Sequence, residues 1–389
     1  MSYKSTFDFL LIFLAILCSG SLYYTGYNDD LFLIVFFAVS IVAYIITGQF
    51  KLSKVFTYYA IFGSLYLLIH VFATDHVSHF NTYLGYMVRI FIFLLVYSFV
   101  GQKRFAGVYV QIMLTLAFLN MIVYVDHVFL LNLSESIADR LPQLRTWNNH
   151  PHDNFVVYFS PSFTTSTASL IKNPGIFWEG GAYQYFLNLA LIFNIYARRK
   201  ALLSFPNILL IATIISTFST IGYIILGAVL ASTPSIKSFS YKINLKTLLV
   251  VPLVIFLMFS SVIVDKFFNK QSQNYKSTSR RILDAQVELS IISSYPLMGI
   301  GLGNNEKWVE ISQSMGGGRS SSNGILNYAS KLGIFGLLVT LYPIFLVKMR
   351  SRESRLVVLC TILTSLSQNI ILTPVFLLSI AVLEKREST

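Results

Sequence analysis

A single carboxylate stands on a tight turn in the middle of the chain, in the sequence Asn173-Pro-Gly-Ile-Phe-Trp-Glu-Gly-Gly-Ala182. The proline and the glycines predict a stiff, sharp turn into the apolar run that follows, which places Glu179 and Trp178 where water meets lipid. A carboxylate held there could accept a proton from a hydroxyl group or orient that hydroxyl. The alternative is an acid that complements a helix macrodipole, with Trp178 as an interfacial anchor. Tyr183 and Gln184 follow at the helix start, where their polar ends could reach a bound molecule or a neighbouring helix.

A second group of reactive side chains lies within residues 279–293. Arg280, Asp284 and Glu288 recur there at the i, i+4 spacing of a helix, beside a broad apolar surface. This pattern predicts a short helix lying at the membrane surface, with Arg280 and Arg281 at its N-terminal end.

The glycine-rich stretch Tyr295-Pro-Leu-Met-Gly-Ile-Gly-Leu-Gly-Asn304 follows this predicted helix. It resembles a phosphate-binding loop only superficially, because no Gly-Lys-Ser/Thr follows it. The glycines predict a tight turn beneath a helix, and a nest of backbone N–H groups facing an anion is the alternative.

Further arginines complete the set of residues that could do chemistry. Arg89 lies about five residues inside the apolar run 84–100, roughly 7–8 Å from its border, where an arginine usually faces the bundle interior or a wet cavity. Snorkelling to the interface is the alternative. Arg319 lies in a flexible, glycine-rich tip without a neighbouring acid in the sequence, so a solvated loop charge is its alternative. Together with Arg280 and Arg281 these guanidinium groups suit bidentate phosphate contacts at a border of low dielectric constant.

The elements that must position these side chains are membrane helices. The chain has 389 residues, of which 55% are hydrophobic, 15% aromatic and only 12% charged, and its mean hydropathy is +0.65. Soluble domains carry about 25% charged residues, so this composition excludes an ordinary soluble protein and predicts an all-α, polytopic membrane bundle. The net charge of +12 is spread in small groups between apolar runs, which excludes a nucleic-acid-binding face.

Apolar runs of suitable length predict eleven or twelve spans in one membrane domain over residues 1–389. The last run is long and interrupted by Gln368, Asn369 and Pro374, so it is expected to form two short spans. The runs are Phe7–Tyr24, Leu31–Thr47, Val55–Ala73, Leu84–Val100, Val108–Val125, Gly181–Ala197, Leu203–Thr217, Ile221–Ala231, Thr247–Val264, Gly324–Val347 and Leu356–Leu383.

The orientation of these spans follows from the distribution of Lys and Arg. Alternate short connections and the N-terminus hold such residues, whereas the connections 25–30 and 74–83 hold none. By the positive-inside rule the N-terminus is cytoplasmic, and two long segments, 126–179 and 265–323, lie outside. Connections of that length are usually functional, and both are expected to contain short amphipathic helices. Cys18 and Cys360 lie within apolar runs, so neither a disulfide nor a metal site is expected.

Four stretches of this sequence, in this order, resemble the superfamily of bacterial O-antigen ligases and polymerases, the WaaL- and Wzy-like membrane proteins. Together they cover roughly the middle 40% of the chain. The stretches are Gly175-Ile-Phe-Trp-Glu-Gly-Gly-Ala-Tyr-Gln184, Phe218-Ser-Thr-Ile-Gly-Tyr223, Arg281-(x)14-Pro296-Leu-Met-Gly-Ile-Gly-Leu-Gly303, and Asn323 with Gly333-Ile-Phe-Gly-Leu337.

The resemblance implies a GT-C-type fold and a metal-independent glycosyltransferase without a cofactor. Such enzymes use undecaprenyl-diphosphate-linked glycans at the outer side of the bacterial plasma membrane. Arg281 matches the arginine of the external helix that contacts the diphosphate in the ligases. The ligases place a histidine before the asparagine that matches Asn323, whereas this chain has Ser322 there and no histidine in 265–323. This departure favours a polymerase and leaves the catalytic base open between Glu179, placed first, and His152, placed second.

The resulting hypothesis is a polysaccharide polymerase of the O-antigen or capsule type. It would transfer a growing glycan from undecaprenyl diphosphate to an incoming lipid-linked repeat unit, with Arg89, Arg280, Arg281 and Arg319 stabilising the leaving diphosphate. Two alternatives are a ligase acting on lipid A core or protein, and a transporter of lipid-linked oligosaccharide. The resemblance also implies a chain-length regulator and a flippase as partners.

Overall fold

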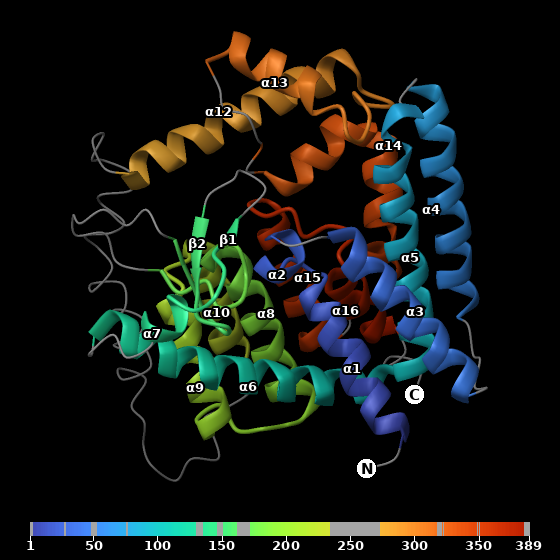
Figure 1. The fold of residues 1–389 in the computed structure, drawn as a ribbon. Coiled ribbons are helices and arrows are strands. Elements are labelled where there is room, and N and C mark those ends of the chain that lie inside the picture. The colour runs from blue at the N-terminus through green and yellow to red at the C-terminus, as the bar shows by residue number, and fades with distance from the viewer. Residues whose placement is uncertain are drawn as a thin grey trace.

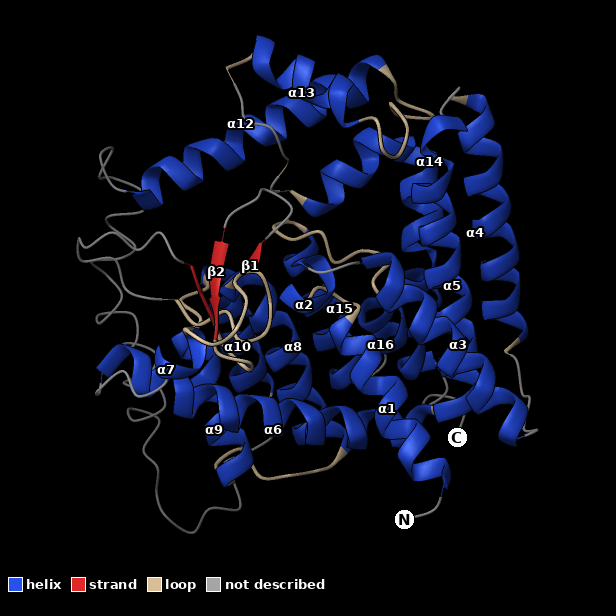
Figure 2. Ribbon diagram, viewed as in Figure 1, coloured by secondary structure: helices blue, strands red, loops and turns tan. Residues whose placement is uncertain are grey.

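The computed structural model describes residues 3–26, 29–47, 53–74, 77–129, 135–145, 151–161, 172–233, 273–316, 321, 323–347, 349 and 351–384. This part of the chain is mostly helical and contains one small sheet (Figures 1 and 2). The predicted all-α class is therefore confirmed. The predicted span Thr247–Val264 and the site residue Arg319 lie outside the described residues.

In the first half of the chain most helices follow the predicted apolar runs, but the predicted span Phe7–Tyr24 is divided between one helix that ends at Leu17 and another that begins at Leu22. The helices of this half are α1 (Tyr3–Leu17), α2 (Leu22–Gly26), α3 (Asp29–Thr47), α4 (Lys54–Ala73), α5 (Phe80–Val100), α6 (Gln102–Phe129) and α7 (Glu135–Ala138), with a 3-10 turn η1 (Val77–His79). The second half contains α8 (Gly180–Ile192), the π-helical turn η2 (Phe193–Ala197), α9 (Phe205–Ser216), α10 (Thr220–Ser232), α12 (Gln273–Ser294), α13 (Asn305–Ser314), α14 (Gly324–Leu346), α15 (Arg352–Ser365) and α16 (Pro374–Glu384).

Four helices among the described residues are long and apolar enough to cross a membrane: α4, α5, α14 and residues 104–127 of α6. Residues 30–46 of α3 and the helices α9 and α10 are apolar but shorter. Large apolar side chains such as Ile45, Phe62 and Phe72 are exposed on α3 and α4, as expected for helices that face lipid. The protein is therefore a multi-pass membrane protein, and the total of eleven or twelve spans stays a prediction.

Helix α8 is the centre of the bundle. Its sequence is mostly apolar, which is typical of a buried helix, and its residues from Ala182 to Ile192 are all buried, including the polar Gln184 and Asn188. It packs against α6, α9, α10 and α15. Phe177, just before the helix, stacks on Phe186 with ring centroids 4.1 Å apart. The tight turn that was predicted from the sequence therefore opens into a helix that is almost completely buried.

The segment before α8 forms a small antiparallel sheet, where only short helices were predicted. Its strands β1 (Leu144–Arg145), β2 (Pro151–Asn154) and β3 (Phe159–Pro161) are ordered β1-β2-β3. The sheet is tied to the turn at Gly175, whose carbonyl accepts a hydrogen bond from the Phe159 N–H at 3.1 Å. The Asn173 side chain bonds to Asn120 of α6 and Ser216 of α9 at 2.7 and 2.9 Å. These bonds fix the entry to α8 from three directions.

Helices α12 and α13 lie across one end of the upright helices α4, α5 and α14 (Figure 1). The glycine-rich stretch between α12 and α13 packs into a break in α14, where Gly333 has a φ of 71°. Around this break the N–H groups of Ile300 and Gly301 donate to the Ser330 and Lys331 carbonyls, each at 2.9 Å. Because these N–H groups are used inside the protein, the glycines serve the predicted tight turn and not an anion-binding nest.

Candidate functional site

The start of α14 brings together residues from four distant parts of the sequence. We call this group the α14 cluster. Its members are Glu179, Arg281, Glu288, Ser321, Asn323 and Gln368.

Asn323 and Gly324 form the centre of the α14 cluster. Asn323 is the N-cap residue of α14, and its side-chain amide donates to the main-chain carbonyl of Arg281 at 3.2 Å. A Cβ at Gly324 would overlap the carbonyl oxygens of Gln368 and Ser365, so the close approach of α15 requires glycine there. The start of α14 is thus fixed between α12 on one side and the end of α15 on the other.

Glu179 lies on the α15 side of the cluster. It is the N-cap residue of α8 and has an extended backbone, but its side chain makes no capping hydrogen bond. Its Oε1 instead accepts a hydrogen bond from the side-chain amide of Gln368. Trp178 beside it packs over Gly20, where any larger residue would overlap the indole ring. The sequence identified Glu179 but not Gln368, which is close only because the chain folds back after α15.

Arg281 and Glu288 lie on the α12 side of the cluster. Helix α12 begins at Gln273, earlier than predicted, so Arg281 lies in its third turn and not at its N-terminal end. Arg281 is partly exposed and Arg280 is exposed, whereas Glu288 and Asp284 are fully buried. The Oε1 atom of Glu288 accepts a hydrogen bond from the Ser321 hydroxyl.

Burial raises the pKa of Glu288 to about 8, and the negative charge of Asp284 adds to this rise. The hydrogen bonds from the Ser321 and Asn323 side chains and the positive charge of Lys331 act in the opposite direction and only partly offset it. The side chain is therefore mostly protonated at neutral pH and ionises as the pH rises through about 8. A carboxyl group with such a pKa is a stronger base, once ionised, than an ordinary one.

The sequence contained a signal for the burial of Glu288 that the i, i+4 interpretation missed. Asp284, Val287, Glu288 and Ile291 have the i, i+3, i+4, i+7 spacing of one helix face, and all four are fully buried. The two acids therefore lie on the apolar face of α12. The i, i+4 spacing with Arg280 predicted the helix but did not indicate that the two acids are buried.

Arg89 lies on α5, near the first half of α14, and is surrounded by tyrosines. Its Nη2 donates to the Tyr24 hydroxyl at 2.8 Å, and its guanidinium lies 4.8 Å from the centre of the Tyr86 ring. The Tyr86 hydroxyl is 3.4 Å from that of Tyr328 on α14. Lys331, one turn further along α14, donates to Asn305 at 3.0 Å. Arg89 therefore points into the bundle, in agreement with the interior alternative and not with snorkelling.

The structure brings some of the predicted site residues together and separates others. Arg281, Asn323 and Glu179 meet at the start of α14, and Arg89 approaches the same helix from α5. Within the described part of the chain, no hydrogen bond or ring contact joins Arg89 to Arg281. His152 is buried on the central strand β2, in register with Leu144 and Pro161.

Tyr183 and Gln184 were predicted as contacts for a substrate, and both are buried in α8. Gln184 donates to the Gly181 carbonyl and to the Thr364 hydroxyl, at 3.1 and 3.2 Å. The Tyr183 ring lies against Gly175 in the turn before the helix. Both residues support the turn that holds Glu179, and their side chains are enclosed by the bundle.

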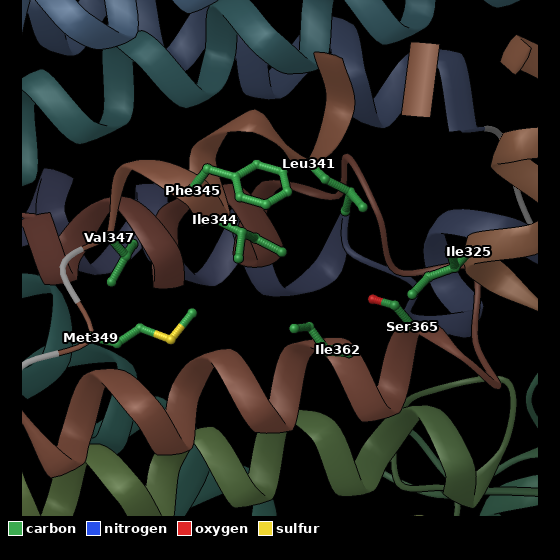
Figure 3. Close-up of a pocket in the computed structure, with 8 residues that line it drawn as sticks. All are labelled: Ile325, Leu341, Ile344, Phe345, Val347, Met349, Ile362 and Ser365. Carbon is green, nitrogen blue, oxygen red and sulfur yellow. The ribbon is translucent and has the colours of Figure 1, made fainter. Parts of the chain in front are cut away.

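An apolar cavity of about 310 Å³ lies between α14 and α15 (Figure 3). One end lies near the α14 cluster, because Ile325 follows Gly324 directly and Ser365 contacts that glycine. Neither Arg89 nor Arg281 lines this cavity, so the predicted arginines do not converge on it. Its lining residues are Ile325, Leu341, Ile344, Phe345, Val347, Met349, Ile362 and Ser365.

Comparison with known proteins finds one family model that matches part of this chain. Residues 205–341 match the model of the O-antigen ligase family. The match includes Arg281, Glu288 and Asn323, and it confirms the resemblance to the superfamily of O-antigen ligases and polymerases. This is a family of glycosyltransferase-like membrane enzymes, and the match does not separate polymerases from ligases. No curated protein sequence matches the chain.

Proposed function

We propose that this chain, which carries the domain of the O-antigen ligase and polymerase superfamily, is a polysaccharide polymerase. It transfers a growing glycan from undecaprenyl diphosphate to the non-reducing end of an incoming lipid-linked repeat unit. The main observation in support is the bond from Asn323 to the backbone of Arg281, which holds a partly exposed arginine of α12 at the start of α14. Ser322 and the lack of histidine in 265–323 favour a polymerase over a ligase.

The proposed reaction needs stabilisation of a leaving group more than its protonation. A sugar hydroxyl of the acceptor attacks the anomeric carbon of the donor, and the lipid diphosphate leaves already ionised. Arg281, with Arg89, Arg280 and Arg319, stabilises the charge that develops on the diphosphate. Glu179 accepts the proton of the attacking hydroxyl or orients that hydroxyl, and His152 is the second candidate for the base. Neither a metal ion nor a cofactor takes part in this scheme.

The proposed location is the bacterial inner membrane, with the N-terminus in the cytoplasm and the α14 cluster facing the periplasm. Segments 126–179 and 265–323 are then the two extracytoplasmic parts of a single membrane domain. The position of α12 and α13 across one end of the upright helices suits this orientation (Figure 1). A chain-length regulator and a flippase are proposed partners, since a polymerase needs lipid-linked units delivered to its outer face.

Replacing Arg281 by Lys tests the proposed role of the guanidinium. Lysine keeps the charge but loses the planar fork, so we expect polymer formation to fall about a hundredfold, a loss typical for one stabilising donor. The measurement is polymerisation of the native lipid-linked repeat unit by purified protein in detergent. The matched control is Arg355→Lys on α15, where an exposed arginine lies outside the α14 cluster. Full-length polymer from the Arg281 variant would count against the proposed site.

Two experiments distinguish a polymerase from the two alternatives, a ligase and a transporter. The family model is described as that of O-antigen ligases, so a ligase that acts on lipid A core or protein is the second candidate. A deletion strain that keeps a single repeat unit on its acceptor but loses long chains indicates a polymerase. A strain that loses all transfer to the acceptor indicates a ligase. Elongation in detergent, where no sealed membrane exists, excludes a transporter as the explanation.

A further inference from the structure

We propose that Ser321 and Glu288 form a proton relay that removes the proton from the attacking sugar hydroxyl. Ser321 contacts the acceptor sugar, and the buried Glu288 receives the proton through the serine hydroxyl. Glu179 then orients the acceptor, and its carboxylate is not the final proton acceptor. The inference rests on the proposed glycosyl transfer and assigns a step that the proposed function leaves open.

The geometry places Ser321 between the start of α14 and the interior of the protein. Its hydroxyl donates to Glu288 Oε1 and accepts a hydrogen bond from the Asn323 N–H at 3.1 Å. Asn323 in turn holds the backbone of Arg281. The hydroxyl is partly exposed, whereas the carboxylate behind it is fully buried. A small polar group at the cluster is thus connected to an enclosed carboxylate.

Among the residues that the structure describes, the buried carboxylate of Glu288 is paired only in part. A buried carboxylate is costly unless both of its oxygens are paired. The Oε2 atom of Glu288 has no hydrogen-bond partner among the residues that the structure describes. The described titratable groups that act on it are Asp284, of like charge, and Lys331, whose amino group is bonded to Asn305. The Ser321 hydroxyl and the Asn323 side chain act on this carboxylate at the start of α14, where its ionised form is a strong base.

The proton and electron balance of the step is complete without a further reactant. The acceptor hydroxyl gives its proton to Ser321 Oγ while the serine gives its own proton to Glu288 Oε1. The acceptor oxygen forms the new bond to the anomeric carbon. The bond from that carbon to the diphosphate oxygen breaks, and the electron pair leaves with the diphosphate. Glu288 ends the step protonated and releases the proton to water before the next cycle.

The test compares four variants in the detergent polymerisation assay. We expect Glu288→Gln to lose a hundredfold or more of the rate, a typical contribution of general base catalysis. Ser321→Ala is expected to lose a similar amount, whereas Ser321→Thr, which keeps the hydroxyl, retains most of the activity. Asp284→Asn is the matched control, because it changes an equally buried acid one turn away on the same helix face. If Glu288 had only a structural role, Asp284→Asn and Glu288→Gln would lower the polymerisation rate by similar amounts.

The pH profile gives a second measurement. Because the relay needs ionised Glu288, the wild-type rate should rise as the pH increases through about 8. Asp284→Asn should move this rise to lower pH, since Asp284 contributes to the raised pKa of Glu288. The residual rate of Glu288→Gln should lack the rise. A wild-type rate profile in the Glu288→Gln enzyme overturns the relay and leaves the polymerase proposal intact, whereas absence of polymer from the wild-type enzyme overturns both.

Discussion

At the scale of single residues, the arginines of this protein divide into two environments. Arg281 is partly exposed on α12 and held through its backbone, whereas Arg89 lies among Tyr24, Tyr86 and Tyr328 on the inner side of α5. A guanidinium in a low-dielectric bundle is costly unless aromatic faces and hydroxyl groups compensate it. The sequence could predict the depth of Arg89 from its position in an apolar run. Tyr86 lies three residues before Arg89 on the same helix, but the sequence could not predict Tyr24 and Tyr328, which come from α2 and α14.

Arg89→Lys tests whether the guanidinium has a role beyond packing. Lysine lacks the planar surface that lies over the Tyr86 ring, so we expect a fall in polymerisation of about tenfold or more. The thermal unfolding of the variant in detergent should change by only a few degrees, because the charge and most of the side-chain length are kept. Unchanged polymerisation would restrict Arg89 to a structural role.

The two carboxylates show what sequence reasoning at this scale can and cannot provide. Glu179 stood out because it is the single acid on a glycine-rich turn, and the structure places it in the α14 cluster. Glu288 was noticed only as part of an i, i+4 series with Arg280. Its importance depends on Ser321, 33 positions further along the chain, and no local pattern predicts that contact.

At the scale of the elements, the break in α14 organises the end of the molecule where α12 and α13 lie. Hydropathy predicts one continuous span over Gly324–Val347, because a break leaves the apolar composition unchanged. The structure interrupts this helix at Gly333 and packs the glycine-rich stretch after α12 into the gap. At the break, a main-chain carbonyl finds a partner outside the helix: the carbonyl of Leu332 accepts a hydrogen bond from the Tyr66 hydroxyl at 2.6 Å. The sequence predicted a tight turn at these glycines, but it did not predict that the turn packs against α14.

Gly333→Ala should destabilise the protein. The residue has a positive φ, and a Cβ there would overlap the Leu297 carbonyl, so we expect a loss of about 2 kcal/mol or more. Thermal inactivation in detergent measures it. Gly227→Ala on α10 is the matched control, since a Cβ there meets open space and alanine favours a helix. Equal stability of the two variants would show that the break does not depend on glycine at position 333.

At the scale of the whole molecule, composition and hydropathy determine the class of protein but not the packing. The predicted span Gly181–Ala197 corresponds to α8 with the π-helical turn η2. The last apolar run forms two helices, α15 and α16, as the interrupting residues predicted. The small sheet β1-β2-β3 was not predicted, because its strands are only two to four residues long and lack a readable alternation.

The proposed orientation can be tested by labelling introduced cysteines in whole cells. Ser314→Cys on α13 and Arg199→Cys after α8 replace exposed residues, and the native Cys18 and Cys360 are buried. We expect an impermeant maleimide to label the first variant in intact spheroplasts and the second only after permeabilisation. The reverse pattern would place the α14 cluster in the cytoplasm, away from the proposed lipid-linked glycan.

The most direct test of the account maps where the lipid diphosphate binds. A photoreactive group on the isoprene unit next to the diphosphate of an undecaprenyl diphosphate probe would be activated in the presence of the purified protein, and the cross-linked peptides identified by mass spectrometry. If the α14 cluster binds the diphosphate, cross-links form on α12 around Arg281 and at the start of α14, and they are reduced in the Arg281→Lys variant. Cross-links confined to helices away from the α14 cluster, and unaffected by that substitution, would contradict it.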